Sequence, residues 1–439
     1  MSTATLHAGA AAVDITPGRP LFLVGYPHVP RTSTGVHDPL YASALCLRNH
    51  GADVILVAVD ILFVTHETAR RCRDRITEAT GVPAANILIS ATHTHSAPVT
   101  FAYLSFRHDG VTPPPDPEYM AVFEDGIVRA AVHAWRGAAP ARLAVTSARA
   151  DGVGGNRLSP DGIADPEVGI LYVERAGDGV PLALSMVYAM HPTVLHEDSR
   201  LVSADFPGYA RQHLAARFPG VTVLSHTGPA GNQSPRYHVS GQTFAEAERL
   251  GRRLADAVAR AVSGLGAADF TDQPVLDGRQ RFVMLTPRLF STVREAEDRR
   301  RSASERYGRL QREGAPHGPL RTAECAVFGA EELVTLAEAQ AAGELSALHR
   351  AEMPAEVQVL RIDDACWVGL RGEWFVEYGL RIKRLAPRRT FVISLANGEL
   401  QGYIVTPEAD RAGGYEAACS LYGPEAGVLM ADAAMELIG

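Results

Sequence analysis

Hydrophobic and polar positions along this 439-residue chain follow two periods. Short apolar runs rich in β-branched residues, each closed by Gly, Pro or a polar group, predict buried strands. They lie at 8–16, 41–48, 53–60, 87–91, 141–148, 182–190, 221–225, 357–362, 366–370 and 390–396. Helical periodicity marks 65–80, 119–136, 207–218 and 245–264. This order predicts an α/β fold: a mixed, mostly buried β-sheet core flanked by helices.

Residues 288–350 differ in character from the rest of the chain. They are rich in Arg, Glu and Ala and keep a helical period, so we expect a solvated helical insertion. Residues 105–118 are rich in Pro and irregular, which predicts a loop over the site. We found no repeat and no low-complexity linker, and we therefore interpret residues 1–439 as a single domain.

Composition narrows the class of protein. A hydrophobic content of 46% with 21% charged residues is typical of a soluble globular protein, and the net charge of −8 argues against a nucleic-acid partner. No window is apolar enough for a transmembrane segment, and the first residues lack a secretory leader, so we expect a cytoplasmic protein. The five scattered cysteines, without a CxxC pair, are interpreted as buried free thiols in a reducing compartment.

Polar groups with catalytic potential follow several of the apolar runs. His93 and His95 come after the run at 87–91, and on an extended chain their spacing points both side chains to one face. The other groups in this position are Asp60, His191, Glu373 and Tyr403. If the sheet is mostly parallel, these strand ends share one edge, where open α/β sheets place their chemistry.

Two histidines and a carboxylate are enough to hold a catalytic zinc that keeps one position for water. Each residue also has a structural alternative: the His93/His95 pair as a polar strand edge, His191 as a satisfied core histidine, and Glu373 as a surface carboxylate. Two other zinc hydrolase patterns do not fit. The regular eightfold alternation of a TIM-barrel amidohydrolase is missing, and Ser96 follows His95 where metallo-β-lactamases continue their HxHxDH motif.

The segment 92–98, Thr-His-Thr-His-Ser-Ala-Pro, resembles the THTHSGP motif of the neutral/alkaline (non-lysosomal) ceramidases. Further segments resemble motifs of that family in the same order along the chain. They are Asp14-Ile15-Thr16-Pro17, Gly25-Tyr26, 35–40 (GVHDPL), Asn156-Arg157, His191-Pro192-Thr193, 201–205 (LVSAD), 231–235 (GNQSP), Arg371-Gly372-Glu373, 402–406 (GYIVT), 414–418 (GYEAA) and 422–424 (YGP). So many motifs in one order are specific for the catalytic domain of the family.

The resemblance implies one Zn²⁺ per chain. Its ligands at the matching positions are His93, His191, Glu373 and Tyr403. The groups implied around the reacting carbonyl are His95, Arg157 and Tyr415, with Ser234 close to the metal.

Elementary chemistry agrees with these implied roles. Zinc lowers the pKa of a bound water to about 7 and polarises a carbonyl, so that the water can attack an amide. Arg157 and Tyr415 can hydrogen-bond the tetrahedral oxyanion, and His95 can protonate the leaving amine. Asp60 and Asp205 are candidates for orienting a ligand histidine, or for capping a helix instead.

The implied substrate is a small or lipid-like linear amide, an N-acyl amide of the ceramide type. Several motifs depart from the family pattern around the metal positions: 231–236 reads GNQSPR in place of GDVSPN, and Arg371 replaces the proline of PGE. The family's C-terminal immunoglobulin-like domain has no counterpart before Gly439. These departures leave ceramide, a smaller N-acyl amide and an ester as alternatives, and the oligomeric state open.

Two other functions compete with a zinc-dependent amidohydrolase. The first is a serine hydrolase or esterase that uses Ser234 beside a structural metal, although GNQSP is not a GxSxG nucleophile elbow. The second is a non-catalytic member of the same family. A half-open zinc site flanked by oxyanion donors would be of no use to such a binding module.

Overall fold

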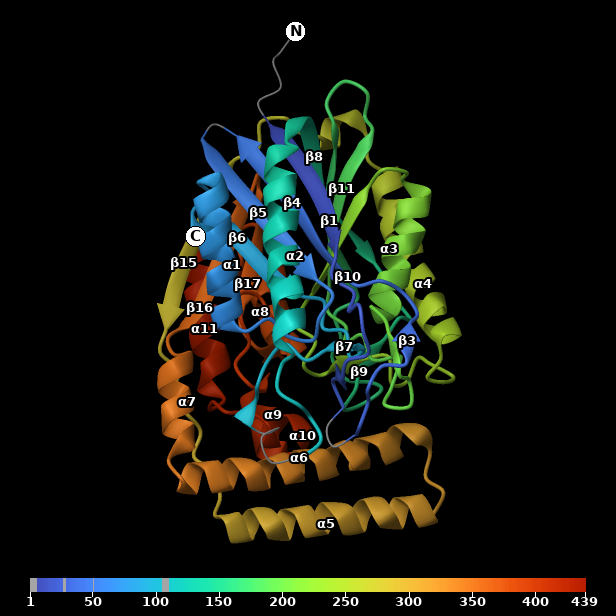
Figure 1. Cartoon of the computed structure of the whole chain (residues 1–439), viewed down its shortest axis with the longest axis vertical. Helices are drawn as coiled ribbons and strands as arrows, with labels where there is room; N and C mark the ends of the chain where they lie inside the picture. Colours follow the sequence, from blue (N-terminus) through green and yellow to red (C-terminus); the bar gives the residue numbers. More distant parts are fainter. Residues whose placement is uncertain (1–5, 27–28, 50, 105–109) are drawn as a thin grey trace.

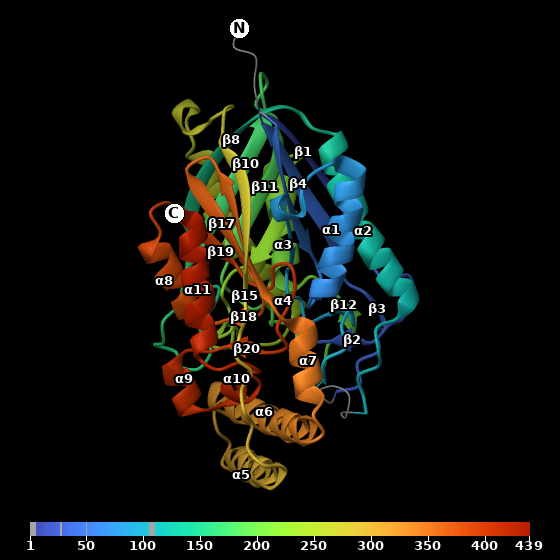
Figure 2. The same cartoon turned by 90° about the vertical axis from the view of Figure 1, so that its left-hand side faces the viewer.

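The computed structural model describes residues 6–26, 29–49, 51–104 and 110–439. Two β-sheets pack face to face, and helices cover their outer faces (Figures 1 and 2). The predicted α/β class with a buried mixed sheet is confirmed. The predicted loop at 105–118 lies partly outside the described residues, and its described part runs to Asp116, the N-cap of a helix.

The larger sheet has eight strands in the order β13-β11-β10-β8-β1-β4-β5-β6. Their bounds are β1 (His7–Asp14), β4 (Tyr41–Asn49), β5 (Ala52–Val59), β6 (Ile87–Ala91), β8 (Ala139–Arg149), β10 (Glu167–Arg175), β11 (Pro181–Tyr188) and β13 (Thr222–Thr227). The two halves of the sheet, β1-β4-β5-β6 and β8-β10-β11-β13, are joined in the strand ladder by a two-residue pairing between β1 and β8.

The sheet is mixed, as expected, and the mostly parallel order that would by itself bring the strand ends to one edge is not present among the described strands. Only β5 with β6 and β11 with β13 are parallel, and the other neighbours are antiparallel. The chemistry-bearing ends nevertheless meet, because the edge strands β6 and β13 are tied together. Ser90 Oγ lies 2.7 Å from His226 Nδ1, and Thr227 Oγ1 donates to Thr92 O at 2.8 Å.

The smaller sheet has the order β15-β16-β17-β19. Its strands are β15 (Leu276–Val283), β16 (Ala355–Ile362), β17 (Ala365–Leu370) and β19 (Arg389–Ile393). Trp367 and Phe391 project from it into an apolar layer shared with the larger sheet, where they are buried with Leu88. This layer holds the two sheets together.

Helices cover both outer faces of the sheet pair (Figure 2). They are α1 (His66–Thr80) and α2 (Pro117–Arg136) over one half of the larger sheet, α3 (Asp205–Arg217) and α4 (Phe244–Ser263) over the other, and α8 (Val376–Leu385) and α11 (Glu425–Ile438) over the smaller sheet. Among the helices that the structure describes, none has both the length and the apolar composition that a membrane crossing needs.

Short elements gather where the strands of the larger sheet end. Pairs of two-residue strands are β2 (Leu23–Val24) with β7 (Ala97–Pro98), β3 (Gly35–Val36) with β12 (Leu201–Val202), β9 (Gly155–Asn156) with β14 (Gln233–Ser234), and β18 (Glu373–Trp374) with β20 (Tyr403–Ile404). Short helices are α9 (Pro407–Ala412) and α10 (Tyr415–Ala418), with 3₁₀ turns η1 (Ala84–Asn86) and η3 (Ala267–Asp269).

Residues 288–350 are helical, as their periodicity predicts. They form α5 (Val293–Arg312), α6 (His317–Ala341) and the start of α7 (Glu344–Glu352). In Figure 1, α5 and α6 run across the lower end of the molecule, with α6 between α5 and the strands. Helix α6 is more than a solvated helix, because Leu333 and Leu336 are buried with residues of the C-terminal segment.

The apolar layer between the sheets gives a test of the fold. Phe391→Ala removes a ring that is 1% exposed, and we expect the free energy of unfolding to fall by about 3–5 kcal/mol because a cavity remains. Phe282→Ala is the matched control, because this ring on β15 is 57% exposed and its loss should change stability by about 0.5 kcal/mol or less. Chemical denaturation measures both. Equal losses in the two variants would contradict the two-layer core.

Candidate metal centre and active site

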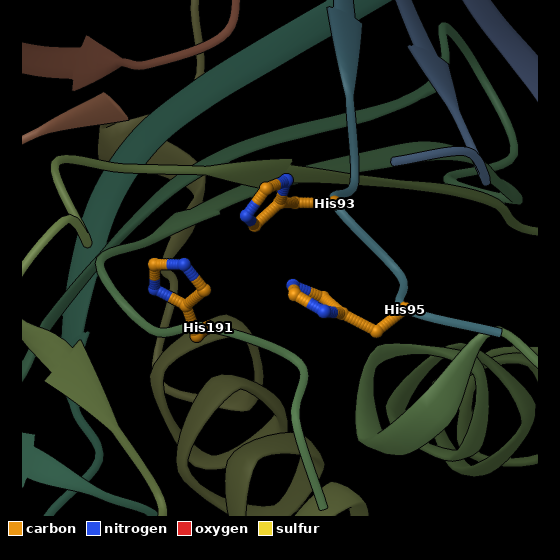
Figure 3. Close-up of side chains that lie close together, drawn as sticks. All are labelled: His93, His95 and His191. Atoms are coloured by element: carbon orange, nitrogen blue, oxygen red, sulfur yellow. The ribbon is translucent and has the colours of Figure 1, made fainter. Parts of the chain in front are cut away.

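Three histidines meet beyond the strand ends (Figure 3). His93 and His95 lie in the loop after β6, and His191 follows β11. The loop is not extended at His93, whose φ of 68° is left-handed and unusual for a residue with a side chain. The rings of His93 and His95 are 4.9 Å apart, those of His93 and His191 4.7 Å. The predicted convergence of the pair is therefore correct, although a turn and not a strand produces it.

Backbone carbonyls orient all three rings. In each ring Nδ1 lies within hydrogen-bond distance of a main-chain oxygen, so Nδ1 carries the proton and Nε2 keeps a free lone pair. The pairs are His93 with Leu62 O at 3.0 Å, His95 with Gly25 O at 2.8 Å, and His191 with Ala230 O at 2.6 Å. Gly25 permits this approach, since a Cβ there would lie 2.6 Å from the His95 ring.

The suggestion that Asp60 or Asp205 orients a ligand histidine was wrong. Asp60 forms an ion pair with Arg211 at 2.7 Å. Asp205 accepts the main-chain N–H groups of Val194 and Leu195 at 3.1 and 2.9 Å. It therefore holds the loop after His191 in place, and carbonyl groups do the orienting that we assigned to carboxylates.

Glu373 and Tyr403 are brought together by one of the two-stranded sheets. β18 and β20 run parallel, and in their register these two residues face each other. Gly402 makes the pairing possible, because its φ is 121° and a Cβ would lie 1.9 Å from Cys419 O. Two residues that are thirty positions apart in the sequence are thus neighbours at the site.

The Glu373 carboxylate completes the cluster. One of its oxygens lies 3.1 Å from His191 Nε2 and 3.4 Å from His93 Nε2. Burial would raise the pKa of Glu373, but the two imidazoles beside it outweigh burial and lower it. The pKa of His191 falls to about 4, because burial and the Arg157 charge disfavour its protonated form.

These observations fit a metal ion. The Nε2 atoms of His93 and His95 are buried and have no hydrogen-bond partner among the described residues. The ligand nitrogens of the three histidines lie within 4.8 Å of one another, and a carboxylate oxygen adjoins two of them. Neutral imidazoles with converging lone pairs beside a carboxylate are the donor set of a zinc site. His95 thus stands as near to the centre as the ligands that the sequence predicts.

Arg157 lies beside this centre, held by a carboxylate that the sequence analysis did not single out. Its Nε donates to Glu416 at 2.7 Å, its Nη1 lies 3.4 Å from His191 Nε2, and its Nη2 is buried without a partner among the described residues. The guanidinium carbon stands 5.2 Å from the ring centre of Tyr403 and 5.9 Å from that of Tyr415. Burial lowers the pKa of Arg157, but Tyr403 and Glu416 outweigh it and raise it.

The two tyrosines form an edge-to-face pair with ring centres 5.6 Å apart. Burial raises the pKa of both phenols, so each keeps its proton and can donate a hydrogen bond in the absence of a cation. A metal ion next to the Tyr403 oxygen would reverse this effect for that residue.

Ser234 reaches the same region from β14, opposite Gly155 in β9. Its Oγ accepts the main-chain N–H of Arg236 at 3.3 Å and has no bond to an imidazole among the described residues. A serine nucleophile needs an adjacent general base. The geometry therefore lacks the base that the serine hydrolase alternative requires.

A cavity that is partly open to solvent adjoins the cluster. His95, Arg157, Ser234, Tyr403 and Tyr415 all line it. The remaining lining was not predicted from the sequence, and it includes Tyr26, His196, Arg236, Gln242 and, from α6, His317, Arg321, Cys325 and Phe328. The helical insertion therefore forms one wall of the site. A second, smaller cavity on the other side of Tyr403 reaches His93 and Glu373.

A scan against family models decides the relationship. Residues 6–229, just over half of the chain, match the model described as neutral/alkaline non-lysosomal ceramidase, N-terminal. The chain belongs to this ceramidase family.

Individual relatives agree with this assignment. A neutral ceramidase from Pseudomonas aeruginosa is 24% identical over 95% of this chain and 69% of its own length. A neutral ceramidase from Mycobacterium tuberculosis is 26% identical over 55% of this chain and 42% of its own length, and neutral ceramidase A from Dictyostelium discoideum is 27% identical over 54% and 36%. The chain thus spans less than half the length of two of these three ceramidases.

Solved ceramidase structures share the fold. A ceramidase complexed with C2 superposes with a TM-score of 0.76 at 21% identity, covering 99% of this chain and 75% of the other. The crystal structure of neutral ceramidase from Pseudomonas aeruginosa gives 0.75 at 22% identity with the same coverage.

Metal content tests the cluster. We expect the purified protein to bind about one zinc per chain, and His93→Ala to lose most of it, because it removes one of the two imidazole nitrogens that lie beside the Glu373 carboxylate. The exposed His133 on α2 gives the matched control, and His133→Ala should keep its metal. Elemental analysis after dialysis measures both. A full zinc content in His93→Ala would show that the zinc is bound elsewhere.

Proposed function

We propose that this chain is a zinc-dependent hydrolase that cleaves a linear amide, an N-acyl amide of the ceramide type. His93, His191, Glu373 and Tyr403 would hold the metal. The observation that supports this proposal most strongly is the set of buried, unpaired imidazole nitrogens beside Glu373, next to a cavity whose wall carries Arg157 and Tyr415. Membership of the ceramidase family and the names of the relatives support the amide as the bond that is cleaved.

Zinc bound by these residues would lower the pKa of a water and polarise the amide carbonyl. Arg157 and Tyr415 supply hydrogen-bond donors on one side of the cavity, where negative charge develops on the carbonyl oxygen. Glu416 keeps the guanidinium of Arg157 in place and balances its charge, so that the donor is ordered before substrate arrives.

His95 is placed to move the proton. Burial, with the neighbouring His93 and His191, lowers its pKa, so the resting imidazole is neutral with a free Nε2. It can take a proton from the attacking water and deliver it to the amine nitrogen as the carbon–nitrogen bond breaks. The bond from Nδ1 to Gly25 O fixes the ring during both transfers.

No contact in the structure favours the serine hydrolase alternative, since Ser234 lacks a bonded imidazole among the described residues. A measurement of hydrolysis separates the non-catalytic alternative from the zinc-dependent hydrolase. Hydrolysis of a panel from ceramides to short N-acyl amides, before and after chelation and with zinc added back, distinguishes the two.

Removing one oxyanion donor should lower turnover without removing metal. Tyr415→Phe deletes the hydroxyl alone, and we expect kcat to fall about 10²–10³-fold with the zinc content unchanged. Tyr209→Phe removes a hydroxyl that bonds His37 away from this cavity and should keep its activity. A Tyr415→Phe enzyme with full turnover would exclude this residue from the oxyanion site.

Replacing His95 separates a role in proton transfer from a role as a metal ligand. If it transfers protons, His95→Ala should keep its zinc and lose about 10²–10⁴-fold in kcat on an amide. The loss should be smaller on an activated ester, whose leaving group needs no proton. Elemental analysis and steady-state kinetics on the two substrates make the comparison. Loss of zinc from His95→Ala would place this residue among the ligands.

A further inference from the structure

Three arginines line the cavity, and two of them have carboxylate partners. These partners are Glu416 for Arg157 at 2.7 Å, and Glu197 and Glu324 for Arg321 at 3.0 and 2.7 Å. Arg236 forms no ion pair with any residue that the structure describes, and the described cavity lining contains no Asp or Glu. Among the residues that the structure describes, the positive charge of Arg236 in the cavity wall therefore has no carboxylate partner.

The Arg236 side chain is half-buried and held from one side only. Its Nη1 donates to Arg157 O at 3.0 Å and to Thr322 Oγ1 at 3.1 Å, and its Nη2 lies 3.5 Å from Cys325 Sγ. A guanidinium has five N–H groups. Nε–H and the second N–H of Nη2 have no bond to a described residue, and this pair forms the edge that receives both oxygens of a carboxylate.

Helix α6 fixes the position of this edge. Thr322 and Cys325, two of the three groups that contact the guanidinium, belong to α6. The helix packs closely on the loop after Arg236, where a Cβ at Gly318 would lie 2.3 Å from the Tyr237 ring. The third contact is the main chain of Arg157, so the charge is anchored to the residue that would hold the oxyanion.

We propose that Arg236 binds a carboxylate of the substrate, so that the amide cleaved is an N-acyl amino acid. This inference rests on the amide hydrolysis proposed above. In an N-acyl amino acid one carbon separates the carboxylate from the amide nitrogen. This short spacing suits a guanidinium that is held against the main-chain oxygen of Arg157. The acyl chain then meets the apolar part of the lining, which includes Tyr26, Val239 and Phe328.

Two substrates of matched size, one charged and one neutral, test the proposal. N-dodecanoylglycine and N-dodecanoylglycinamide differ only in the carboxylate, and the readout is the ratio of their kcat/KM values. We expect the wild-type protein to prefer the acid at least about 10-fold, and Arg236→Gln to lower the ratio about 10–100-fold, mainly through KM of the acid, because a charged hydrogen-bond pair is lost.

Two further variants serve as controls. Arg236→Lys keeps the positive charge but loses the paired N–H donors of the guanidinium, and it should give an intermediate ratio of the two kcat/KM values. Arg300→Gln removes the same charge from an exposed position on α5 and should keep the wild-type ratio. A ratio near one in the wild-type protein, or an equal loss on both substrates in Arg236→Gln, would overturn the assignment.

Binding separates this inference from the proposed function. If the wild-type protein cleaves neither compound, calorimetric titration of both still reports the anion site. Tighter binding of the acid that Arg236→Gln abolishes would support the anion site while contradicting hydrolysis of this amide. Cleavage of both compounds without a charge preference would keep the hydrolase and exclude the anion site. If neither compound is cleaved or bound in a charge-dependent way, the anion site is excluded, and cleavage of the ceramides in the panel decides the hydrolase separately.

Discussion

The constraint on which the site depends is the burial of the Glu373 carboxylate between His93 and His191. Removing a carboxylate from water costs several kcal/mol unless partners compensate. Here the nearest groups are imidazole nitrogens whose lone pairs also face inward, because carbonyl oxygens occupy their Nδ1 sides. Such an arrangement is stable only with a shared cation or proton, so three distant segments must arrive in register.

The two sheets bring these three segments into register. His93 and His191 follow strands in opposite halves of the larger sheet, and the contacts between β6 and β13 bring those halves together. Glu373 arrives from the smaller sheet, which packs on the larger one through Trp367 and Phe391. The apolar layer between the sheets thus stabilises the fold and also sets the spacing between the ligands.

The segments that resemble the ceramidase motifs and the segments that depart from them lie in different parts of the site. The centre is built from sheet ends that match the ceramidase motifs, and solved ceramidases share this architecture. The cavity wall comes from α6 and from the loop at Arg236, where the sequence departs from the motif. The proposed metal ligands thus lie at strand ends, whereas part of the cavity wall lies on the helical insertion.

The sequence by itself predicted most strands and helices, the buried α/β core, and the three histidines and the carboxylate that the structure brings together. Thr65 and Gly81, for example, begin and end α1 as their types predict, since Thr65 caps Thr68 N and Gly81 is left-handed. It did not reveal β10, β15, α8 or α11, and the cytoplasmic location that it suggests stays a prediction. Tertiary structure alone decided that carbonyls orient the histidines, that Glu416 holds Arg157 and that Arg236 is unpaired. Each of these depends on contacts between segments far apart in the chain, and a local pattern of residues carries no record of them.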